Sequence, residues 1–182
     1  MKKIILILNH VTAGMGSDEQ AQLPPGGKKT ALGPGETLAP LFKEKKAEII
    51  ATLYCGDRYY SSHPEEVKQK FIGFAKKFGA DAILCGPAMH YPNFGEMAGG
   101  LVEAFNKEGT PAVAAMSVEN PAVAAMSVEN PAVAKYQQVI PIVKMPKKGG
   151  IGLNQSYKNM ATIVTQLAKG EERTSSEQEM IF

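Results

Sequence analysis

Five short apolar segments recur along the sequence, and amphipathic segments separate them. The apolar segments are residues 4–8, 48–54, 81–85, 112–116 and 139–143. Continuous apolar runs of this length are typical of strands that are buried on both faces of a parallel sheet. Strands that alternate with helices in this way predict an α/β fold with right-handed crossovers.

The helical segments between the strands support this prediction. Val67, Phe71, Phe74 and Phe78 share one face of a helix that starts near Pro64 and ends at Gly79. Similar patterns predict further helices around residues 97–105, 157–168 and 37–45. Five strands favour a flavodoxin-like three-layer fold with the strand order 2-1-3-4-5 and the first strand in the centre.

Length and composition bound the domain organisation. The 182 residues are enough for one α/β domain, which we expect over residues 1–170. The charged residues 171–182 are expected to form a frayed tail. Pro141 cannot donate a ladder hydrogen bond, so the fifth strand should lie at an edge of the sheet. Residues 10–35 are too many for an ordinary strand-to-helix loop, and loops of this length usually carry function.

Charge and hydropathy exclude several classes of protein. Lysine and arginine total 20 and aspartate and glutamate total 18, a balance that argues against a nucleic-acid-binding protein. No apolar run approaches the roughly 18 residues of a membrane span. The apolar stretch near the N-terminus is too short for a signal peptide. Two cysteines do not make a disulfide scaffold, which favours a cytoplasmic location. The three histidines show no metal-binding spacing.

An exact duplication interrupts the pattern. Residues 111–120 read PAVAAMSVEN, and residues 121–130 repeat them letter for letter. Ten residues is not the period of a known repeat fold, so a recent or engineered duplication is the favoured interpretation. One copy would supply the fourth strand, and the other would form an inserted loop or a short helix.

Deleting residues 121–130 should therefore leave a folded protein of equal or greater stability, because a long loop insertion changes the closure entropy little. Urea denaturation of the deletion variant checks this expectation. Loss of the cooperative unfolding transition would contradict it.

Polar residues gather where the predicted strands end, which is where open parallel sheets bind ligands. A strand end is often polar without being a site, and this alternative remains open for each loop taken alone. The glycine loop at residues 13–16 lacks the third glycine and the lysine of phosphate-binding motifs, so it predicts close backbone approach rather than nucleotide binding. The candidate substrate-binding residues are Asn9, Gly14, Gly16, Asp18, Glu19, Gly56, Asp57, Gly86, Pro87, Met89, Asn93 and Asn120.

Three residues are candidates for catalysis. Cys55 precedes a predicted helix, whose N-terminus would lower the pKa of its thiol, although a buried strand-end cysteine is the alternative. Cys85 ends the next strand, too far away for a disulfide with Cys55. His90 would converge with His10 across adjacent strands. Glu119, or its copy Glu129, would act as an acid or base, with a solvated loop as the alternative.

The strand-end motifs, taken in order, resemble the N-terminal region of component B of the glycine/sarcosine/betaine reductase complex, a selenoprotein B family. The resemblance covers roughly residues 9–172. The tetrapeptide HYPN at residues 90–93 replaces the family's N-A-G-R. The matching motifs are NHVTAGMGSDE (9–19), ALGPG (31–35), YCGDRYY (54–60), GPAMHYPNFG (86–95), ENP (119–121 and 129–131) and LAKGEE (167–172).

This resemblance implies reductive cleavage of a C–N bond in glycine, sarcosine or betaine. The family's selenocysteine lies in a C-terminal half, so the expected partners are other reductase subunits, including a separately encoded selenocysteine- or thiol-containing half. The expected ligand is a small amine carboxylate; no cofactor is assigned, and self-association is left open. The alternatives are a non-catalytic binding or assembly subunit and a flavodoxin-like small-molecule-binding protein. A yellow colour from bound flavin would identify the last of these.

Overall fold

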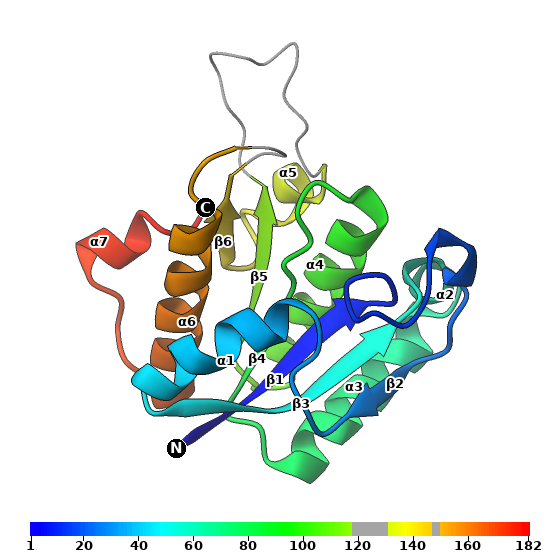
Figure 1. The fold of residues 1–182 in the computed structure, drawn as a ribbon, viewed down its shortest axis with the longest axis horizontal. Helices are drawn as coiled ribbons and strands as arrows, with labels where there is room; N and C mark the ends of the chain where they lie inside the picture. Colours follow the sequence, from blue (N-terminus) through cyan, green and yellow to red (C-terminus); the bar gives the residue numbers. More distant parts are fainter. Residues whose placement is uncertain (118–130, 147–149) are drawn as a thin grey trace.

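The computed structural model describes residues 1–117, 131–146 and 150–182. These residues form a sheet with helices on both of its faces (Figure 1). The strands are β1 (Lys2–Asn9), β2 (Gly26–Lys28), β3 (Ala47–Cys55), β4 (Ala82–Cys85), β5 (Ala112–Ser117) and β6 (Ile142–Met145). The helices are η1 (Asp18–Gln20), α1 (Pro34–Glu44), α2 (Asp57–Ser62), α3 (Pro64–Phe78), α4 (Pro92–Lys107), α5 (Ala132–Tyr136), α6 (Leu153–Lys169) and α7 (Ser175–Gln178).

The sheet has six strands in the order β2-β3-β1-β4-β5-β6. The five predicted strands form its parallel part in the predicted order, with β1 in the centre, and every side chain from Ile4 to Leu8 is fully buried. One layer contains α1 and α6, and the other contains α2, α3, α4 and α5. The α/β three-layer prediction is confirmed.

The sequence did not predict β2, which pairs antiparallel with the outer side of β3. Gly26, Gly27 and Lys28 have no preference for strands, and their pairing rests on backbone hydrogen bonds to residues 52–54. Thr52 supports this edge, because its hydroxyl donates to the carbonyl of Thr30 at 2.8 Å. Part of the long segment between β1 and α1 therefore pairs with the edge of the sheet and is not an exposed loop throughout.

The last strand begins later than predicted. The pattern favoured residues 139–143, whereas β6 covers Ile142–Met145 and Pro141 precedes it. Val139 is 58% exposed, in keeping with its place outside the sheet. The strand does lie at an edge, as Pro141 indicated.

The C-terminal residues differ from the frayed tail that the charged sequence predicted. They form α7 and then a bridge between Ile181 and Val143 on the outer side of β6. The backbone N–H groups of Lys144 and Phe182 donate to Met180 and Ile142, at 2.9 and 3.0 Å. Ile181 is only 8% exposed, so burial of an apolar side chain fastens this segment to the sheet.

Candidate functional site

A cavity of about 240 Å³ lies beyond the carboxyl ends of β1, β3 and β4. Its lining comes from four segments: the loop after β1, the segment around η1, the first turn of α2 and the start of α4. Parallel strands end at one edge of the sheet, which is why segments so distant in sequence meet there. The cavity is lined by His10, Asp18, Ala21, Asp57, Arg58, Tyr91, Pro92 and Asn93.

Asn9 holds one carboxylate of this cavity in place. As the last residue of β1, it lies beside Cys55 in the register of the sheet, two residues from Asp57. Its amide Nδ2 donates to Oδ2 of Asp57 at 3.1 Å. Its Oδ1 accepts from the backbone N–H and the hydroxyl of Thr12, at 2.9 and 2.7 Å. Asn9 and Asp57 are both buried, so this bridge fixes the Asp57 side chain relative to the loop after β1.

The loop that carries Asp18 and Ala21 is bonded to the first turn of α2. The N–H of Gly56 donates to the carbonyl of Leu23 at 2.8 Å, and the N–H of Tyr59 donates to the carbonyl of Ala21 at 3.0 Å. A Cβ at Gly56 would clash with the Ala21 carbonyl and lie 2.6 Å from the Leu23 nitrogen. Glycine is required there by this close approach of two backbones.

His10 is the most unusual residue of the lining. It follows β1 and is 1% exposed, and neither Nδ1 nor Nε2 has a hydrogen-bond partner among the described residues. Tyr91, by contrast, is 48% exposed at the start of α4. The ring of His90 packs against Tyr91 with centroids 4.4 Å apart. Of the two histidines expected to converge, His10 therefore lines the cavity, whereas His90 contacts Tyr91 and is not among the lining residues.

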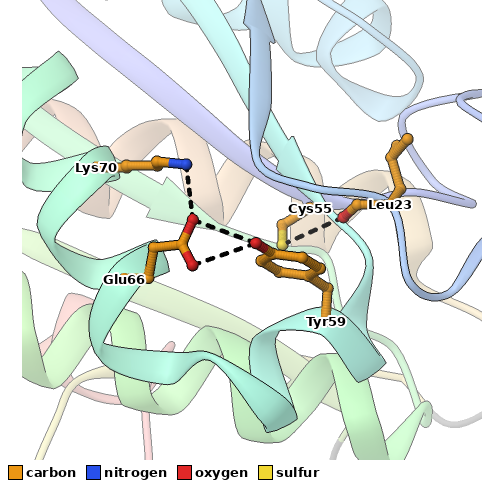
Figure 2. Close-up of polar contacts among 5 residues, drawn as sticks. All are labelled: Leu23, Cys55, Tyr59, Glu66 and Lys70. Carbon is orange, nitrogen blue, oxygen red and sulfur yellow. Dashed lines mark hydrogen bonds and ion pairs between the residues drawn. The ribbon is translucent and has the colours of Figure 1, made fainter.

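Cys55 lies beside this cavity, but its thiol is held as a neutral group. Figure 2 shows its sulfur directed at the carbonyl of Leu23, 3.7 Å away, and it also donates to the carbonyl of Gly56 at 3.3 Å. Burial, followed by the negative charge of Asp57, raises the pKa of Cys55 to about 12. The expectation that the α2 N-terminus lowers this pKa is wrong, because the loss of hydration outweighs a helix of six residues. Burial also raises the pKa of Cys85.

Both cysteines should consequently resist thiol reagents in the native protein. At pH 8 we expect no rapid reaction with a disulfide reagent such as dithionitrobenzoate, because the reactive thiolate is scarce and both side chains are fully buried. Two thiols should react after denaturation in urea. A stoichiometric fast phase in the native protein would contradict this prediction, and a Cys55→Ser variant would show whether Cys55 causes it.

Beside Cys55, Figure 2 shows a chain of polar contacts that joins α2 to α3. The hydroxyl of Tyr59 donates to both carboxylate oxygens of Glu66 at 3.2 Å, and Lys70 pairs with Glu66 at 2.7 Å. The hydrogen bond from Lys70 is the main cause that lowers the pKa of Glu66. This chain connects α2 to α3 and does not line the cavity.

The predicted binding residues fall into three groups. Asp18, Asp57 and Asn93 line the cavity, and Asn9 and Gly56 support it. The glutamate and the asparagine of the repeated motif, Glu119 and Asn120, lie outside the described residues. The remaining predicted residues belong to the surrounding loops and are absent from the lining described above: Gly14, Gly16, Glu19, Gly86, Pro87 and Met89.

The other lining residues, apart from His10, were not among the candidates: Ala21, Arg58, Tyr91 and Pro92. His10 was considered only for catalysis. Arg58 lies inside the motif YCGDRYY, directly after Asp57, so its charge at a strand end could have marked it as a candidate binding residue. The burial of His10 had no comparable signal, since a histidine after a strand is more often exposed to solvent than fully buried.

Two further features of the described chain bear on the chemistry. Within residues 1–117, 131–146 and 150–182, no cluster of three histidine, cysteine or acidic side chains is arranged to hold a metal ion. The helices of the same ranges include none with the length and apolarity needed to cross a bilayer.

Comparison with known proteins gives a consistent match. The family model for glycine/sarcosine/betaine reductase selenoprotein B matches residues 1–182. The sarcosine reductase complex component B subunit beta of Peptoclostridium acidaminophilum is 31% identical over 93% of the chain, which covers 36% of that protein. The glycine reductase complex component B subunit gamma of Carboxydothermus hydrogenoformans is 30% identical over 97% of the chain, which covers 38% of that protein.

A third relative is the betaine reductase complex component B subunit beta of Peptoclostridium acidaminophilum, which is 29% identical over 66% of the chain and is covered over 27% of its own length. The chain thus spans well under half the length of these curated relatives. No solved structure matches it significantly.

Proposed function

The chain belongs to the glycine/sarcosine/betaine reductase selenoprotein B family, and from this membership we propose that it is a component of a reductase complex that cleaves C–N bonds reductively. Its cavity at the strand ends would bind a small amine carboxylate. The relatives are named for three amino acids of this class, in which a carboxylate and an ammonium group lie close together.

The charge pattern of the cavity is the observation that supports this proposal. Arg58 offers a guanidinium to a carboxylate, and Asp18 and Asp57 offer carboxylates to an ammonium group. The volume of about 240 Å³ is below the roughly 300–1,000 Å³ of pockets for drug-sized ligands, which suits a ligand of a few heavy atoms.

Arg58→Met tests the binding site. We expect it to weaken the binding of glycine or sarcosine by at least about 10-fold in isothermal titration calorimetry, because a hydrogen-bonded charge pair is lost. Arg173→Met is the matched control, since it removes the other arginine of the chain, between α6 and α7 at the opposite edge of the sheet. Equal affinity of the Arg58→Met and unmodified chains would contradict the proposed site.

A non-catalytic assembly role is the competing function, and the short span relative to the curated relatives favours it. Assays of reductive C–N cleavage with and without the other subunits separate the two functions. Turnover by the chain alone would exclude the assembly role. A requirement for the other subunits, combined with ligand binding by the chain, is the outcome we expect.

A further inference from the structure

The buried imidazole of His10 is unpaired within the described part of the chain, although it lines a polar cavity. Proteins pair the great majority of their buried polar atoms, so two unpaired ring nitrogens on one fully buried side chain call for an explanation. The simplest explanation is that a ligand in the cavity pairs with the imidazole, because the ring forms part of the cavity wall. A neutral imidazole has one nitrogen that accepts a hydrogen bond and one that donates.

The other polar groups of the lining include two carboxylates, and Arg58, which only donates, lies beside them. The carboxylates of Asp18 and Asp57 accept hydrogen bonds only, and Oδ2 of Asp57 already accepts one from Asn9. With Arg58 assigned to the carboxylate of the ligand, these two carboxylates and the acceptor nitrogen of His10 are left to accept hydrogen bonds from its amine end. An ammonium group that carries N–H bonds supplies those donors.

A quaternary ammonium group would meet a poorly matched lining. Proteins recognise such groups with cages of aromatic faces, whereas a single phenol ring, that of Tyr91, stands among the described lining residues and is half exposed. Without N–H bonds, the ligand would leave the acceptor nitrogen of the buried His10 unpaired. It would also give no hydrogen bond to the carboxylates of Asp57, which is buried, and Asp18, which is exposed. The loss of such pairing is strongly unfavourable in a site built from hydrogen-bonding groups.

We propose that this cavity selects amine carboxylates that carry N–H bonds over quaternary ones, and that His10 is a specificity-determining residue for this selection. The inference rests on the proposed function, in which a small amine carboxylate binds here. It narrows the substrate class to primary and secondary amines, of which glycine and sarcosine are the simplest.

A series of methylated ligands tests the inference. Glycine, sarcosine, N,N-dimethylglycine and betaine share a carboxylate and a positive charge, and each successive methyl group removes one N–H donor. Titration calorimetry of the 182-residue chain should show affinity falling along the series, with betaine at least about 10-fold weaker than glycine. Betaine binding as tightly as glycine would overturn the selection and leave the proposed function intact. Binding of none of the four would overturn the proposed ligand site as well.

Two substitutions test the part played by His10. His10→Leu removes both ring nitrogens at similar size, whereas His10→Gln keeps an acceptor oxygen and a donor. We expect the ratio of betaine to glycine dissociation constants to shrink at least about 3-fold in His10→Leu and to persist in His10→Gln. A purely structural role would change both affinities together and leave this ratio unaltered, which would overturn the assignment. The ligand series on the unmodified chain decides the selection even if a variant does not fold.

Discussion

Replacing Gly56 with alanine is expected to lower the free energy of unfolding by about 3 kcal/mol or more. The added methyl group would overlap the carbonyl of Ala21 and lie 2.6 Å from the nitrogen of Leu23, so two backbone segments would have to separate. That separation would also break the hydrogen bond from Gly56 to Leu23. Urea denaturation followed by circular dichroism measures the change.

Gly73→Ala is the matched control for this substitution. Gly73 lies in the middle of α3, and a Cβ there would meet no atom within 4 Å. Alanine at this place should stabilise the protein by about 0.5–1 kcal/mol, because it restricts the unfolded chain and favours the helix. If the two variants had the same stability, the close approach of the Gly56 and Ala21 backbones would not be important.

The second large effect is expected from Asn9→Asp. The substitution hardly changes the shape of the side chain, but it places a carboxylate where Nδ2 lies 3.1 Å from Oδ2 of Asp57. Two like charges at 4 Å repel by about 4 kcal/mol at the effective dielectric constant near a protein surface, and a hydrogen bond is lost as well. We expect a destabilisation of about 3–5 kcal/mol at pH 8.

This loss should depend on pH in a defined direction. At lower pH the two carboxyl groups can share one proton, which replaces the lost hydrogen bond. The folded variant then holds a proton that the unfolded chain has released, so its stability relative to the unmodified protein falls as the pH rises from 5.5 to 8. Urea denaturation at both pH values measures the difference.

The exchanged pair, Asn9→Asp with Asp57→Asn, provides the control. It restores one amide and one carboxylate in contact and should recover most of the stability at pH 8. Failure of the exchange to recover stability would show that repulsion between residues 9 and 57 is not the cause of the loss, because an aspartate at residue 9 can still accept the two hydrogen bonds from Thr12.

The central strands could be predicted because a strand buried on both faces reads as an uninterrupted apolar run. Ile4 to Leu8 is such a run, and the structure buries it completely. Gly26, Gly27 and Lys28 form a strand through backbone pairing alone, which leaves no trace in side-chain periodicity. At the C-terminus, the apolar Ile181 indicated a contact with the core, but the charged residues before it favoured the prediction of a frayed tail.

The candidate site could be predicted as a region but not as a set of contacts. The rule that ligands bind at strand ends placed Asp18, Asp57 and Asn93 at one edge, and these three residues line the cavity. A single sequence does not show which of several neighbouring polar residues at a strand end directs its side chain into the cavity. Cys55 was therefore chosen as a candidate for catalysis, whereas the structure buries its thiol against the carbonyl of Leu23 and places His10 in the lining.

The hydrogen bonds from Gly56 and Tyr59 to the loop at residues 21–23 link the motions of two parts of the cavity. When this loop opens, the first turn of α2 loses the carbonyls that its N–H groups contact. Asp57 and Arg58 lie between those N–H groups, so the two charges cannot keep their positions while the loop is open. The loop and the charged wall therefore form one cooperative opening unit. The amides of Gly56 and Tyr59 should accordingly give the same free energy of opening in hydrogen exchange.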